Sequence, residues 1–84
     1  MIKSIPFPSY NNNTMETKII RKMEGEFIVY SLYKNTFKDG DFNFNVIEFS
    51  KKHDLELSND VFDTLRKANN YLKRYTSYCK EVKQ

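Results

Sequence analysis

The clearest pattern of apolar and polar positions lies in residues 58–75. Apolar side chains recur there at spacings of four, three, four and three residues, at positions Val61, Leu65, Ala68, Leu72 and Tyr75. Such spacing places them along one side of an α-helix. Ser58 is a suitable N-cap, because its hydroxyl can accept a hydrogen bond from an amide of the first turn. The pattern therefore predicts a long amphipathic helix over residues 58–75.

A second, shorter helix is predicted just before it, over residues 46–53. Val46, Ile47 and Phe49 would face inward. Residues 54–57 would form the tight turn between the two helices, with Leu55 and Leu57 filling the core. A short helix, a tight turn and a longer helix together make a helix-turn-helix.

The apolar run in residues 25–37 fits two structures. Read as a helix, it places Ile28 below Leu32 and Val29 below Tyr33, and Asp39-Gly40 ends it. Read as strands, its aromatic and β-branched residues pair Phe27–Lys34 with Phe42–Phe49 across a hairpin turn at residues 38–41. The helix is favoured because the following helices need one to pack on. The predicted fold is therefore mainly α, and the alternative is an α+β fold in which a hairpin precedes the helices.

The chain has 84 residues, 39% of them hydrophobic and 15% aromatic, so one domain with a small core is expected. Residues 1–14 contain Pro6 and Pro8, which favour extended backbone, and they are predicted to form an arm. Residues 15–84 form the predicted helix-turn-helix domain.

Charge is distributed unevenly along the chain, although the net charge is only +3. Residues 64–84 contain six lysines and arginines against one acid, whereas residues 46–63 contain two lysines against five acids. A basic end beside an acidic middle favours contact between the end of the chain and phosphate groups.

The basic helix face is the predicted DNA-binding site. Arginine and asparagine can read base edges in the major groove, while lysine binds phosphates. The predicted contact residues are Lys51, Lys52, Asn59, Arg66, Lys67, Asn70, Lys73 and Arg74. Against this prediction, Asp60 and Asp63 would place carboxylates in the first turns of the same helix, where recognition helices usually meet the bases.

Little in the sequence points to catalysis. His53 is the single histidine and Cys79 the single cysteine, so a metal site of the usual ligand count is not expected, and neither are catalytic residues or a cofactor. The chain has no apolar run long enough to span a membrane. We expect a non-enzymatic, cytoplasmic protein.

The layout of residues 24–75 resembles the N-terminal winged-helix module of phage and plasmid replication initiators and replisome organisers. The likeness lies in the order of a first helix at Glu26–Tyr33, a loop at Asp39-Gly40-Asp41, and a helix-turn-helix at Val46–Leu72. Because no two-stranded pattern follows Tyr75, the wing would be reduced or absent. The resemblance implies a DNA-binding regulator or replication accessory protein that acts as a homodimer. A helix-turn-helix without a wing but with a long final helix often dimerises or binds protein instead.

A protein partner is the alternative. The acidic first turns of the long helix, the missing wing and the six tyrosines, a residue enriched at interfaces, suit a small inhibitor or adaptor that binds an enzyme and not DNA. This function goes with the hairpin alternative for residues 27–49.

Overall fold

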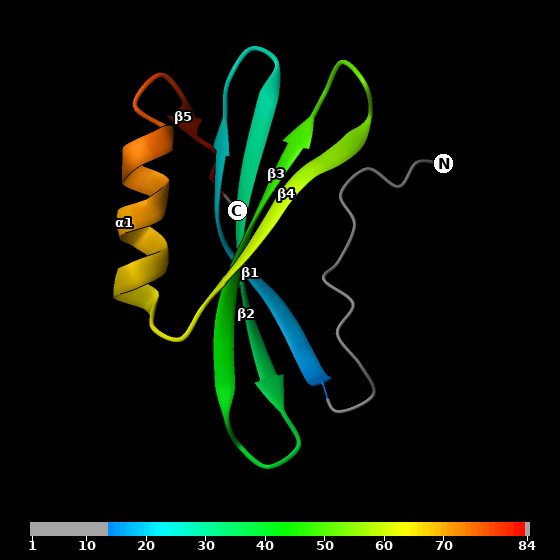
Figure 1. Ribbon diagram of the computed structural model, residues 1–84, viewed down its shortest axis with the longest axis vertical. Coiled ribbons are helices and arrows are strands. Elements are labelled where there is room, and N and C mark those ends of the chain that lie inside the picture. Colours follow the sequence, from blue (N-terminus) through cyan, green and yellow to red (C-terminus); the bar gives the residue numbers. More distant parts are fainter. Residues whose placement is uncertain (1–13, 84) are drawn as a thin grey trace.

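The computed structural model describes residues 14–83, which form an antiparallel sheet with one helix packed on one face (Figure 1). The elements are β1 (Thr14–Glu24), β2 (Ile28–Phe37), β3 (Phe42–Ser50), β4 (Leu55–Phe62), α1 (Leu65–Tyr75) and β5 (Lys80–Glu81). The strands lie in the order β4-β3-β2-β1-β5, so the first four form a meander and α1 carries the chain back to place β5 beside β1. Apart from Thr14, the predicted arm lies outside the described residues.

The prediction of a helix over residues 25–37 is wrong, and the hairpin alternative is correct. β2 pairs with β3 so that Val29 lies opposite Phe49 and Lys34 opposite Phe44. The β2–β3 turn is closed by hydrogen bonds from Phe37 N to Asp41 O (2.8 Å) and from Gly40 N to Phe37 O (2.9 Å). Gly40 has a φ of +90°, a conformation that glycine adopts without steric cost.

The predicted helix-turn-helix is absent. Residues 46–50 belong to β3, residues 58–62 belong to β4, and the helix begins only at Leu65. Its N-cap is Thr64, whose hydroxyl accepts from Lys67 N at 3.2 Å, and not Ser58, whose hydroxyl donates to Glu48 at 3.1 Å. Pairing with β3 draws residues 58–62 into the sheet because it gives their amides and carbonyls partners on a neighbouring strand. The mainly α prediction and the winged-helix resemblance are therefore both wrong.

The core between the sheet and α1 comes from alternate residues of the central strands and from one side of the helix. Leu32 and Val46 lie at its centre on β2 and β3, and Ala68 and Leu72 face them from α1. Met23, Tyr30 and Phe44 complete the buried cluster. The predicted stripe on residues 58–75 is correct only at Ala68 and Leu72, because Val61, Leu65 and Tyr75 are exposed.

The opposite face of the sheet combines buried apolar side chains with a chain of side-chain amides. Val29, Ile47 and Phe49 are buried there. Nearer the β2–β3 turn on the same face, Thr17 donates to Asn35 (2.9 Å), Asn35 donates to Asn43 (3.0 Å) and Asn45 (3.1 Å), and Asn45 donates to Asn59 (2.8 Å). These bonds link β1, β2, β3 and β4 in one register. Within residues 14–83, no helix is long and apolar enough to cross a membrane.

Candidate functional site

The outer edge of β4 combines free backbone with exposed apolar side chains. Among the described residues, β4 pairs with β3 on one side and with no strand on the other. The exposed fractions of Leu55, Leu57 and Val61 are 47%, 47% and 52%. Leu57 lies where the register between β3 and β4 shifts, so it has no direct partner residue on β3. The prediction that Leu55 and Leu57 fill the core is therefore wrong.

The charge along this edge is negative. β4 contains Glu56 and Asp60 and no lysine or arginine, and Asp54 directly precedes it. Of the two lysines in the preceding turn, Lys51 is bound to Glu24 with an Nζ–Oε2 distance of 2.7 Å, and Lys52 is exposed three residues before Leu55. Hydrogen bonding to that ammonium lowers the pKa of the Glu24 carboxyl. The β4 edge therefore presents carboxylates without compensating cations of its own.

A row of aromatic rings lies beside β4 on the helix side. The ring centroids of Phe62 and Tyr71 are 5.3 Å apart, and those of Tyr71 and Tyr75 are 4.8 Å apart. Burial of the side chain is the main cause that raises the pKa of Tyr71 to about 12, and a hydrogen bond with Asp60 is the second cause. Tyr75 is nearly half exposed, so the row leads from the partly buried Phe62 at the end of β4 to solvent. Negative charge and aromatic faces thus lie together at this edge.

The solvent side of α1 is a separate, basic surface. It carries the exposed side chains Arg66, Lys67, Asn70, Lys73 and Arg74, opposite the buried Ala68 and Leu72. No acid lies in the first turn of α1. Asp63 precedes the helix and pairs with Lys67 at 3.1 Å.

The remaining predicted DNA contacts lie elsewhere. Lys51 and Lys52 are in the β3–β4 turn, and Asn59 on β4 accepts the hydrogen bond from Asn45 on the face opposite α1. The structure therefore brings together five of the eight predicted residues and separates the other three from them.

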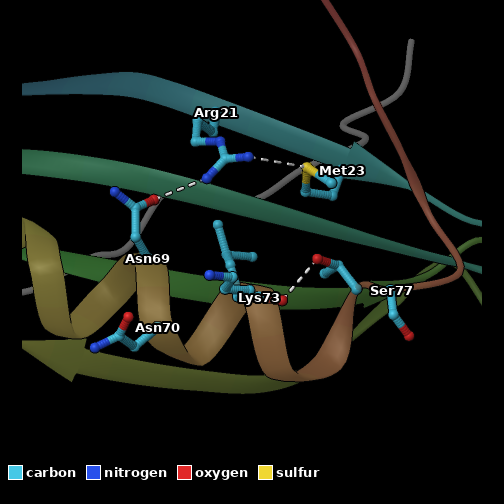
Figure 2. Close-up of a pocket in the computed structure, with 8 residues that line it drawn as sticks. Arg21, Met23, Asn69, Asn70, Lys73 and Ser77 are labelled. Carbon is cyan, nitrogen blue, oxygen red and sulfur yellow. Dashed lines mark hydrogen bonds between the residues drawn. The ribbon is translucent and has the colours of Figure 1, made fainter.

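A pocket between β1 and α1 is lined by Arg21, a residue that was not among the predicted site residues (Figure 2). Arg21 donates to Glu81 through two nitrogens (2.9 and 3.1 Å) and to Asn69 on α1 (2.9 Å). The hydrogen bond from Arg21 lowers the pKa of the Glu81 carboxyl. Through these hydrogen bonds Arg21 connects β1, α1 and β5. Because its nitrogens already donate to protein acceptors, few donors of Arg21 remain to bind a ligand. Its partners lie 48 and 60 residues away, so local sequence carries no signal for this contact.

The described residues provide no group of three or more His, Cys, Asp or Glu placed to hold a metal ion. His53 is exposed in the β3–β4 turn. Burial raises the pKa of the Cys79 thiol, so the lysines near it in sequence do not activate it.

The comparisons with known proteins identify no relative. No family model, curated protein or solved structure matches this chain, and the resemblance to replication initiators therefore has no support from relatives either.

Proposed function

We propose that this protein is a small non-enzymatic binding module, an inhibitor or adaptor, that binds a protein partner along the outer edge of β4. One observation carries the proposal: β4 is an edge strand on which Leu55, Leu57 and Val61 are all about half exposed. Proteins usually protect such an edge with lysine, proline, a β-bulge or a covering segment, because free edges pair with other chains. β4 contains neither lysine nor proline, and the register shift at Leu57 leaves Leu55 and Val61 exposed on either side of it.

The partner would bind by adding a strand to the sheet next to β4. Backbone hydrogen bonds along the edge supply affinity, and alternate side chains supply specificity. Burial of Leu57 and Val61 against the partner adds a hydrophobic contribution, since apolar area removed from water contributes about 25 cal/mol per Å². The β2–β3 hairpin, which accompanies this function in the sequence interpretation, is the structure found for residues 28–50.

The test is capture of a stoichiometric protein partner, after nuclease treatment, from cells that naturally contain the protein. We expect Leu57→Lys to reduce capture at least about tenfold, because a buried lysine would face the interface core. Phe42→Ser is the matched control, because it removes an exposed apolar side chain beyond the end of β4. Equal capture by the wild type and Leu57→Lys, both shown to be folded by circular dichroism, would exclude β4 as the binding edge.

DNA binding through α1 is the second candidate, and a specific observation favours it. Since α1 begins at Leu65, Asp60 and Asp63 do not lie in its first turn. Their carboxylates therefore weigh less against contact between this helix and DNA phosphates. The five exposed polar residues of α1 then form one side of a helix with no acid among them.

An electrophoretic mobility shift across a range of salt concentrations tests this candidate. Binding should be strongest at low salt, and Arg66→Ala or Lys73→Ala should weaken it and reduce its salt dependence, because each removes one phosphate-neutralising cation. Lys38→Ala, in the distant β2–β3 turn, is the matched control. Absence of a shift at low salt excludes DNA as the partner.

A further inference from the structure

We infer that the segment bound at β4 is an extended chain carrying lysine or arginine, which joins the sheet as an additional strand. This inference rests on the proposed function, since it specifies the partner of the same edge. Three features carry it: the edge of β4 that pairs with no strand among residues 14–83, the charge of its side chains and the aromatic row beside it.

The backbone of β4 suits an extended partner. The strand is 8 residues long, and its whole length from Leu55 to Phe62 lies at the margin of the sheet. In an antiparallel sheet, about half of the amides and carbonyls of an edge strand point away from its neighbour. An extended segment pairs with these groups, whereas a helix presents no free backbone donors to them.

The charge of the edge selects a cationic partner. Glu56 is exposed and Asp60 is partly exposed, and β4 has no basic residue to pair with either of them. Asp60 lies opposite Val46 on the helix face and Glu56 lies opposite Phe49 on the other face, so lysine or arginine on either face of a bound segment would offset part of this charge. An acidic segment would be repelled.

A second copy of this chain fits the edge poorly. Pairing β4 with β4 of another copy would bring Glu56 and Asp60 from both strands into one ladder, without any cation on either strand. Like charges facing each other in a sheet are destabilising.

Pairing of β4 with β1 of another copy would gain little electrostatic attraction. Val82 N already donates to Lys22 O, and Arg21 is bound to Glu81. The charged side chains of β1 outside the Arg21–Glu81 pair and the Glu24–Lys51 pair are Glu16, Lys18 and Lys22, so their net charge is only +1.

The aromatic row gives a cation a place to bind. Tyr75 is exposed, and Tyr71 hydrogen-bonds with Asp60 beside it. A cation over a tyrosine face and near a carboxylate gains from both the ring quadrupole and the charge. A lysine or arginine of the added strand on the helix side would lie next to this row.

The experiment uses the full chain, labelled with ¹⁵N, and three synthetic peptides of about ten residues. One alternates lysine with valine and threonine, the second has glutamate in place of each lysine, and the third is the lysine peptide N-methylated on alternate amides. We expect the lysine peptide to shift the amide resonances of residues 55–62 and slow their hydrogen exchange. The glutamate peptide should bind at least about tenfold more weakly, and the N-methylated peptide should lose binding because it cannot pair.

Charge variants complete the test. Glu56→Gln should weaken binding of the lysine peptide roughly two- to fivefold, as expected for an exposed ion pair. Glu16→Gln, which removes an exposed carboxylate from β1, three strands away from β4, should leave binding unchanged. Equal binding of the lysine and glutamate peptides, shifts confined to α1, absence of binding, or self-association through β4 in place of peptide binding would each overturn the inference.

These outcomes separate the inference from the proposed function. If Leu57→Lys abolishes partner capture but the lysine peptide does not bind β4, the partner is not a cationic strand while β4 remains the binding edge. If Leu57→Lys leaves capture intact, the proposed function fails regardless of the peptide results.

Discussion

Replacing Leu72 with alanine is expected to lower the free energy of unfolding by about 2–5 kcal/mol. The Leu72 side chain is 1% exposed and packs from α1 into the cluster formed by Leu32 and Val46. Truncation removes its hydrophobic transfer energy and leaves a cavity between the helix and the sheet. Because a small domain has a total stability of only about 5 kcal/mol or somewhat more, the variant should be partly unfolded at room temperature.

Leu65→Ala is the matched control, since it makes the same change seven residues earlier in the same helix. Its side chain is 39% exposed, so less apolar area returns to water and little cavity forms. Urea denaturation followed by circular dichroism compares the two variants. A severe loss for Leu65→Ala together with a neutral Leu72→Ala would show that α1 packs through a different side than the one described here.

Replacing Asn35 with alanine is expected to cost about 2–3 kcal/mol, although the asparagine side chain is polar. Asn35 is 0% exposed and takes part in three side-chain hydrogen bonds, with Thr17, Asn43 and Asn45. Alanine leaves the carbonyl oxygen of the buried Asn45 without this donor, and an orphaned buried polar group carries its full desolvation cost.

Asn59→Ala tests the exposed end of the same network. Asn59 accepts a hydrogen bond from Asn45, but it is exposed, so water can replace the lost acceptor. We expect a loss below about 1 kcal/mol. Thermal denaturation of both variants gives the comparison. Similar small losses for Asn35→Ala and Asn59→Ala would mean that the amide network contributes little to stability.

Two local sequence signals support the hairpin alternative over the favoured helix. Asp39-Gly40 signalled the β2–β3 turn, and the strict alternation of residues 42–46 fits β3, where Phe44 faces the helix and Asn45 the other side. The apolar run of β2 was ambiguous because both faces of this central strand are buried, which removes the alternation that identifies a half-buried strand.

The misassignment of residues 58–62 has a different cause. Val61 and Leu65 are four residues apart, which matches a helical stripe, yet β4 ends at Phe62 and α1 begins at Leu65. Both residues are exposed, so the regular spacing did not correspond to a buried side of a helix. Residues 58–62, predicted as the first turn of the recognition helix, therefore lie on the β4 edge, while most of the predicted DNA contacts remain on α1.

The sequence by itself determined the features that depend on near neighbours. These include the turn at Gly40, the helical character of residues 65–75, whose buried Ala68 and Leu72 were predicted, and the exposure of the basic residues on that helix. Tertiary structure decided whether residues 46–62 became helix or strand, because β4 forms only by pairing with β3. It also decided the Arg21–Glu81 contact and the free edge of β4. Hydrogen bonds between strands join residues that are distant in sequence. The local pattern of apolar and polar residues therefore does not predict which strand lies at the edge of the sheet.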